Sequence, residues 1–212
     1  MRRILCAATA IMAMSWVTQV NAGTMTAGFK GGVNWGDLSG DNAPDNASMR
    51  TGFQGGAFLR SDINPQFGVQ GEVLYVQKGV EGDFLTDDLD IHPATYKLDY
   101  IDIPIVFVAN FPAGDKFGFN VFGGPSFNFN TGATADVEEH GSVDLDNVKG
   151  FEFGAVIGAG LAYKLSSMSL IADVRYSLGA SSISDDIDGE SIDVKNRGIG
   201  LMAGLSFPLG AK

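Results

Sequence analysis

The chain has few of the residues that mark several common classes of protein. It contains one cysteine, Cys6, two histidines, and 14 basic side chains against 25 acidic ones, for a formal net charge of −11 at pH 7. A lone cysteine forms no disulfide within the chain. The acidic balance argues against a nucleic-acid partner, because phosphate contacts need a clustered lysine and arginine surface. It permits divalent cations or basic partners.

Long apolar runs are absent beyond the N-terminus. Met1-Arg2-Arg3 precedes an apolar stretch, Ile4 to Val17, and Val20-Asn21-Ala22 fits a signal-peptidase site. We therefore expect residues 1–22 to be a cleaved signal peptide. Cleavage would remove Cys6 and two arginines, so the formal charge would change from −11 to −13.

Beyond residue 22, no segment approaches the about 20 consecutive apolar residues that a membrane helix requires, which excludes a helical membrane protein. The chain also lacks low-complexity tracts, a proline-rich linker and any break in composition. We expect residues 23–212 to form one domain.

What the sequence does contain is period-two alternation, interrupted by segments of Gly, Asn, Asp and Ser, which is typical of antiparallel strands and turns. This pattern predicts eight strands, at residues 25–35, 51–62, 66–78, 95–109, 117–129, 150–164, 168–178 and 197–208. The connections alternate between long and short, with short ones at Asn64-Pro65, Phe111–Lys116 and Leu165–Ser167. This alternation of long and short connections predicts an all-β fold, an eight-stranded antiparallel up-and-down transmembrane β-barrel.

The two faces of each predicted strand differ in bulk. In the last strand Leu201 and Phe207 lie on a bulky apolar face, whereas Gly200 and Gly204 lie on the opposite, small face. An eight-stranded barrel has room inside only for side chains, so the small and polar face should line the interior. The bulky face should then meet hydrocarbon, and aromatics at strand ends should form the interfacial girdles.

The run Asp99–Phe111, DYIDIPIVFVANF, combines a strongly apolar strand with two acids. Its opening predicts Tyr96, Leu98 and Tyr100 on the outer face. A phase shift then turns outward the residues Ile101, Ile103, Ile105 and Phe107. We expect a bulge near Tyr100 to produce this shift. Asp99, Asp102 and Pro104 would then face inward, with the acids directed toward Arg60, Lys78 or another base.

Four segments carry a resemblance to a known family. They are GFKGGVNWGDLSG from Gly28, TGFQGGAFLRSDINPQFGVQGEVLYVQKG from Thr51, LDYIDIPIVFVANF from Leu98 and FGFNVFGGPSFNF from Phe117. With them the chain resembles the PorT-like outer-membrane β-barrel proteins, which share the architecture of small OmpA- and OmpX-type barrels. The resemblance implies a porin-like barrel in the outer membrane of a Gram-negative-type bacterium. The chain departs from many such barrels, which end on an aromatic residue, because five residues follow Phe207. We expect Leu205-Ser206-Phe207 to serve as the signal that the barrel-assembly machinery recognises.

Charged side chains of both signs fall on the inner face. A narrow lumen with mixed charges favours pairing, because a lone buried charge costs several kcal/mol. The alternative is a polar path for solutes or protons. The predicted interior polar network consists of Lys30, Arg60, Glu72, Lys78, Asp99, Asp102, Glu152, Lys164, Asp173 and Arg175.

The long connections are acidic and hold both histidines, His92 and His140. They carry 18 of the 25 acids, beginning with Asp37 and ending with Asp193. Carboxylates suit Ca²⁺ or Mg²⁺, but no connection has the spacing of an EF-hand. His92 and His140 have acidic neighbours, yet no serine lies beside them in a recognisable catalytic motif. We expect no catalytic residues, no cofactor and no dedicated metal site, with divalent cations as possible partners of the acidic loops.

These observations favour a non-enzymatic outer-membrane barrel with a closed, salt-bridged interior and acidic extracellular loops, in a structural or interaction role. The expected partners are outer-membrane lipid and lipopolysaccharide, and the barrel-assembly machinery during insertion. The alternatives are an accessory component of a secretion machine, which the PorT resemblance suggests, a small channel, or a lipid-modifying barrel enzyme.

Overall fold

The computed structural model describes residues 24–40, 47–85, 91–137, 141–145, 148–183 and 193–210. The expected signal peptide lies outside these residues. The described ranges contain β1 (Met25–Ser39), β2 (Ser48–Asp62), β3 (Phe67–Leu85), β4 (Ile91–Ala113), β5 (Phe117–Val137), β6 (Gly141–Asp144), β7 (Phe151–Lys164), β8 (Ser169–Gly179) and β9 (Lys195–Leu209). They contain no helix that is long and apolar enough to cross a membrane.

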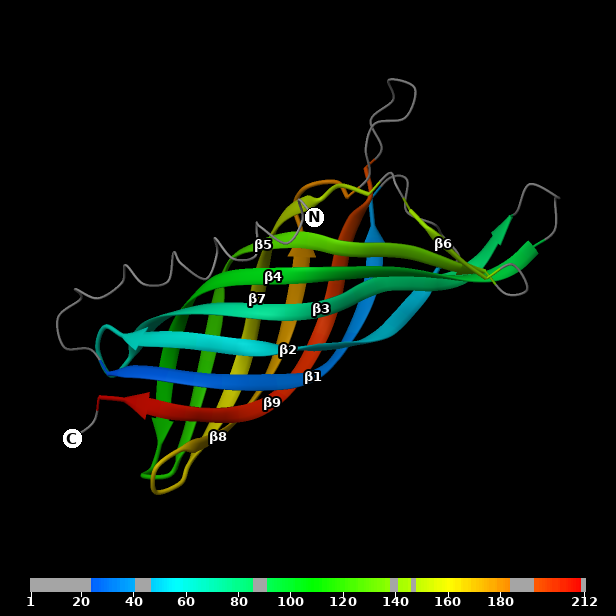
Figure 1. Cartoon of the computed structure of the whole chain (residues 1–212). Helices are drawn as coiled ribbons and strands as arrows, with labels where there is room; N and C mark the ends of the chain where they lie inside the picture. Colours follow the sequence, from blue (N-terminus) through cyan, green and yellow to red (C-terminus); the bar gives the residue numbers. More distant parts are fainter. Residues whose placement is uncertain are drawn as a thin grey trace.

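Eight of these strands form a closed antiparallel barrel (Figure 1). They follow the order β4-β3-β2-β1-β9-β8-β7-β5, and a pairing between β4 and β5 closes the ring. β6 is added outside the ring, where its four residues pair with Thr134–Val137 of β5. The predicted fold class is therefore confirmed.

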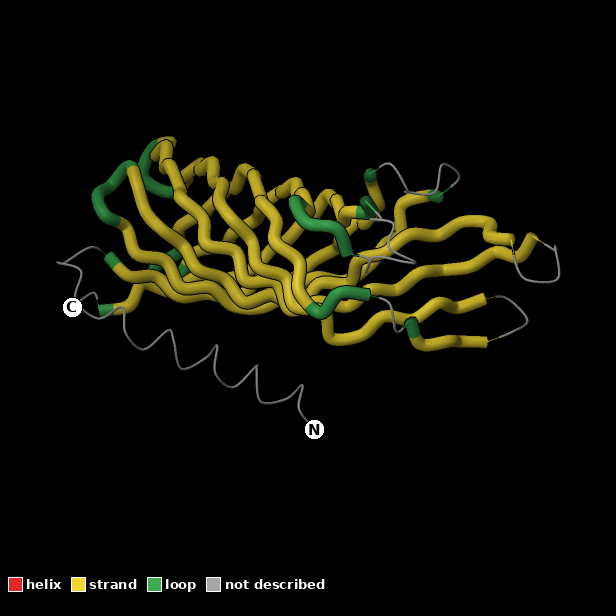
Figure 2. The backbone as a smooth tube through the Cα atoms, turned by 90° about the horizontal axis from the view of Figure 1, so that it is seen from above, coloured by secondary structure: helices red, strands yellow, loops and turns green. Residues whose placement is uncertain are grey.

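The two ends of the barrel differ. At one end, here the short-turn end, β2 joins β3, β4 joins β5 and β7 joins β8 through the three short connections that the sequence predicts. At the opposite, long-loop end, β3, β4 and β5 continue past the ring (Figures 1 and 2). Residues 79–85 pair with 91–97, residues 94–98 pair with 133–137, and β6 completes the sheet.

We call residues 79–85, 91–98, 132–137 and 141–144 the β-extension. The sequence predicted most of these residues to be loops, which is wrong. Their glycines and acids are typical of turns, and a sheet outside a membrane needs no bulky apolar face, so the pattern that revealed the barrel strands is missing.

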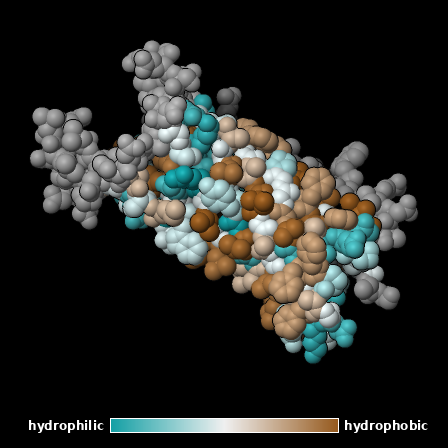
Figure 3. Space-filling model, turned by 180° about the vertical axis from the view of Figure 1, so that it is seen from behind, coloured by the Kyte–Doolittle hydropathy of each residue, from teal (hydrophilic) through white to brown (hydrophobic). Residues whose placement is uncertain are grey.

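The outer face of the ring is apolar along most of its height, as Figure 3 shows for one side, with hydrophilic side chains gathered toward the two ends. Phe107 is 68% exposed and Leu201 is 49% exposed, whereas Met202, the next residue of β9, is 1% exposed. This alternation confirms that the bulky face of the strands points out and the smaller face points in.

The predicted orientation of the first part of β4 is wrong. Leu98 and Tyr100 are 3% and 0% exposed and share the inner face with Asp102 and Pro104. A register shift does occur at this place, but Asp99 pairs with Gly132 and Tyr100 pairs with Asn130, so the extra residue is Thr131 of β5. Because the bulge lies on the partner strand, β4 keeps its phase, and Asp99 lies on the face opposite Leu98 and Tyr100.

Candidate functional site

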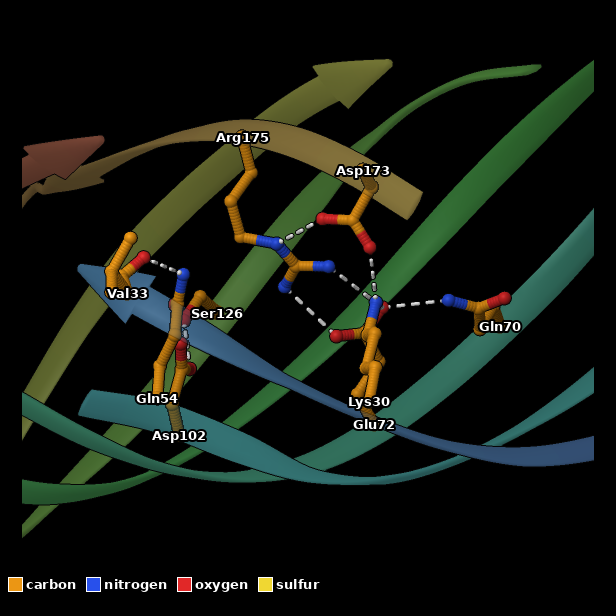
Figure 4. A network of polar contacts seen from close by, with 9 residues as sticks. All are labelled: Lys30, Val33, Gln54, Gln70, Glu72, Asp102, Ser126, Asp173 and Arg175. Carbon is orange, nitrogen blue, oxygen red and sulfur yellow. Dashed lines mark hydrogen bonds and ion pairs between the residues drawn. The ribbon is translucent and has the colours of Figure 1, made fainter. Parts of the chain in front are cut away.

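Four charged side chains meet in the middle of the barrel (Figure 4). Glu72 of β3 lies 2.9 Å from the Lys30 ammonium of β1 and 2.9 Å from the Arg175 guanidinium of β8. Asp173 of β8 lies 3.0 Å from each of the same two cations. We call Lys30, Glu72, Asp173 and Arg175 the central network. Its two positive and two negative groups balance, and it joins strands on opposite sides of the lumen.

The side chains around the central network keep its charges buried and partnered. Glu72 is fully buried and also accepts a hydrogen bond of 2.6 Å from the Gln70 amide. The rings of Phe58 and Phe122 lie 5.5 and 5.9 Å from the Lys30 nitrogen, within reach of a cation–π contact. Charges buried in this way are stable only when paired and hydrogen-bonded, as these are.

A second network lies nearer the long-loop end. Lys78 is 3.6 Å from a carboxylate oxygen of Glu152 and donates to the Asn128 amide oxygen at 2.8 Å. The Asn196 amide donates to Glu152 at 2.9 Å and to the Tyr100 hydroxyl at 3.2 Å. The two networks place charged or amide side chains across the lumen at successive levels.

Apolar side chains close the lumen above the second network. Ile183 and Val194, from the connection between β8 and β9, are hydrogen-bonded to each other at 2.8 Å. Both are buried, and they pack with Leu98 and Tyr100 of β4. These four side chains form an apolar cluster at the long-loop end of the interior.

Below the central network, at the short-turn end, a cavity of about 580 Å³ remains, which we call the lower cavity. Lys30, Asp173, Phe58 and Phe122 border it where it meets the central network. The next void, bordered by Lys78, Asp102 and Asn196, measures only about 10 Å³. That volume is about enough for one water molecule, so of these two voids only the lower cavity has room for a solute.

The structure buries seven of the ten predicted network residues inside the barrel: Lys30, Glu72, Lys78, Asp102, Glu152, Asp173 and Arg175. Asp102 faces inward as predicted and lies near enough to Lys78 for their charges to interact, but among the described residues it forms no ion pair and accepts a hydrogen bond from the Ser126 hydroxyl.

The other three predicted members are not buried within either network. Arg60 lies near the short-turn end, 2.7 Å from Asp62 and 2.5 Å from the Asn110 amide oxygen. Lys164 is exposed at the mouth of the lower cavity, because it is the last residue of β7. Asp99 faces away from the interior, because it lies on the face of β4 opposite Leu98 and Tyr100.

The interior network predicted from the sequence contains only charged residues, so it omits the uncharged members that the structure shows. Asn128, Ser126, Asn196 and Tyr100 are all buried and hydrogen-bonded to the predicted acids or to one another. Ser126 and Asn128 lie within a predicted strand, so the period-two pattern that selected the charged residues could also have selected these two. Tyr100 was predicted to face outward and Asn196 precedes the predicted last strand, so the pattern did not reach them.

With this geometry in view, comparison with known proteins identifies the family. A family model described as an outer membrane protein beta-barrel domain matches residues 18–185. The chain belongs to this family. It is an outer-membrane β-barrel protein of a Gram-negative-type bacterium. In bacterial barrels of this type the short turns generally lie on the periplasmic side and the long loops outside.

Solved outer-membrane barrels share the fold at low sequence identity. OprG from Pseudomonas aeruginosa is 12% identical with a TM-score of 0.53, over 90% of this chain and 97% of that one. Neisserial surface protein A (NspA) is 17% identical with a TM-score of 0.50, over 88% and 97%. The outer membrane protein AlkL is 16% identical with a TM-score of 0.51, over 92% and 95%. No curated protein matches the sequence.

The acidic long connections of this outer-membrane barrel are described only in part. Most of their acids, and His140, lie outside the described residues. Among the residues that are described, no group of three or more His, Cys, Asp and Glu side chains could hold a metal ion. Asp136 of the β-extension instead accepts a hydrogen bond from Lys97, and this contact lowers the pKa of Asp136.

Proposed function

We propose that this outer-membrane barrel is a non-enzymatic protein whose lumen is closed to solutes and whose β-extension binds a partner outside the cell. The observation that carries the proposal is the central network, in which Lys30, Glu72, Asp173 and Arg175 bridge the lumen with contacts of 2.9 to 3.0 Å. A solute that passes would have to break several buried ion pairs, at a cost of several kcal/mol for each charge left unpaired.

The β-extension supports the interaction role because it ends in an open sheet edge. β6 is the last strand of the sheet order in the described part of the chain, and its four residues are exposed. The Leu145 amide donates to Ala133 of β5, so the alternation of an antiparallel ladder turns the amides of Ser142 and Asp144 away from β5. Such unpaired backbone groups accept an added strand from a partner.

A proline at this edge tests the interaction role. Asp144→Pro removes the outward amide and should greatly reduce capture of a partner by a photo-crosslinking residue at position 143 on intact cells. Asp144→Ala, which removes only the carboxylate, should keep the crosslink. The same crosslinked species in equal yield for both variants, or no crosslinked species in the wild type, would contradict the interaction role.

The PorT-like resemblance supports one specific form of this interaction role, an accessory component of a secretion machine.

We further propose that residues 1–22 are removed as a signal peptide, and that lipid, lipopolysaccharide and the barrel-assembly machinery are the partners of the barrel wall. Divalent cations remain proposed partners of the acidic loops. Catalysis is not proposed, because the sequence offers no serine in a motif beside His92 or His140.

A further inference from the structure

The lower cavity has the form of a small-molecule site. Its volume of about 580 Å³ falls within the range of roughly 300–1,000 Å³ that is usual for ligand pockets. It lies at the periplasmic end, and the central network closes its inner end. A solute could therefore enter it from the periplasm without crossing the barrel.

The lining of the lower cavity combines apolar and polar groups. The rings of Phe58 and Phe122 border its inner end, and the amides of Asn110 and Asn120 lie along its wall. Asn120 faces Gly160 of β7, where an added Cβ would come within 2.9 Å of the Asn120 oxygen. Glycine thus keeps room beside an amide that can turn toward a ligand. A few polar groups among apolar ones are what fixes a small solute in a pocket.

The charge of the lower cavity differs in sign from that of the chain. Three cations, Lys30, Arg60 and Lys164, and two carboxylates, Asp62 and Asp173, border it. Lys30 and Arg60 are held by carboxylates, whereas Lys164 has no carboxylate within ion-pair distance in the described part of the chain. In a protein with a formal charge of −11, the mouth of this cavity presents an uncompensated positive charge.

We propose that the lower cavity binds small periplasmic solutes that carry one oxyanion on a polar organic body about the size of a monosaccharide. The oxyanion pairs with Lys164 at the mouth. The body occupies the cavity, with its hydroxyl groups on Asn110 and Asn120 and its less polar face against Phe58 and Phe122. This site is at the opposite end from the β-extension and does not depend on the extracellular role.

Titration of the folded protein in lipid nanodiscs tests the site, with glucose 6-phosphate, glucose and inorganic phosphate as probes. Glucose 6-phosphate should bind saturably, with backbone NMR shifts confined to residues of the lower cavity, and more tightly than either of the other two. Lys164→Gln should weaken it about tenfold, the usual effect of losing one charge-assisted hydrogen bond. Lys116→Gln, the same change in the neighbouring turn, should leave it unaltered, and Ala162→Phe, which fills the cavity, should abolish it.

Several results would overturn the proposal. These are the absence of saturable binding up to millimolar concentrations, equal affinity for glucose or for inorganic phosphate, and equal affinity in the Lys164→Gln and wild-type proteins. Because Lys164 is exposed, its replacement should not disturb folding, which the NMR spectrum of the variant reports directly.

Discussion

Glu72 is the residue on which the central network depends. It is the only group that touches Lys30, Arg175 and Gln70 together among the residues described, and it is fully buried. Without its charge, Asp173 alone faces two buried cations. The strongest consequences of a single substitution should therefore appear here rather than at the exposed acids.

Glu72→Gln should lower the free energy of unfolding by about 3–5 kcal/mol, the usual cost of breaking a buried ion pair by removing one partner. Urea unfolding of the protein in lipid vesicles measures this difference. Glu81→Gln, the same change at an exposed position of the same strand, is the matched control and should change the stability by less than about 0.5 kcal/mol. Equal stability of the two variants would show that the central network contributes little.

Asp136 provides a pH-dependent contact in the β-extension. Its hydrogen bond from Lys97 lowers its pKa below the ordinary value of 3.8. The contact therefore stabilises the extension above that pH, and this contribution disappears as the pH falls through the lowered pKa. Lys97→Met should return the Asp136 titration, followed by carbon-detected NMR, to the ordinary range. An unchanged titration would rule out Lys97 as the cause.

At the scale of the strands, the sequence predicted every barrel strand because lipid imposes a strict requirement. Bulky side chains must alternate with small or polar ones over each crossing, as in Ile199 to Phe207. The β-extension carries no such requirement and was missed. The phase of β4 was misjudged at Asp99, because a bulge can lie on either of two paired strands and the sequence of one strand does not distinguish them.

Gly79 marks the place where β3 enters the β-extension. It has a φ of 123°, which L side chains rarely adopt, and an added Cβ would collide with the Tyr96 carbonyl oxygen of β4. Gly79→Ala should destabilise the pairing of β3 with β4 by about 1–3 kcal/mol, the usual cost of such strain. Faster amide hydrogen exchange in residues 80–85 measures this effect.

Gly71→Ala is the matched control in the same strand, because an added Cβ there meets no atom within 4 Å. It should leave the exchange rates in residues 80–85 unchanged. Equal exchange in the two variants would contradict the assigned role of Gly79.

At the scale of the whole molecule, pairs between distant strands decide whether the barrel is open or closed. Lys30 and Asp173 are 143 residues apart in sequence, and Arg175 and Glu72 are 103 apart. The sequence showed that these groups face inward, and mixed signs favoured pairing. It could not show which groups lie at the same level, because that depends on the register around the closed ring.

Planar-bilayer recording on the purified, folded protein tests directly whether the lumen is closed to ions. Heat-modifiable migration on gels first establishes that the barrel is folded. Because the central network and the apolar cluster of Leu98, Tyr100, Ile183 and Val194 both lie across the interior, we expect no steady single-channel conductance. A large and steady conductance from the wild-type protein would contradict it.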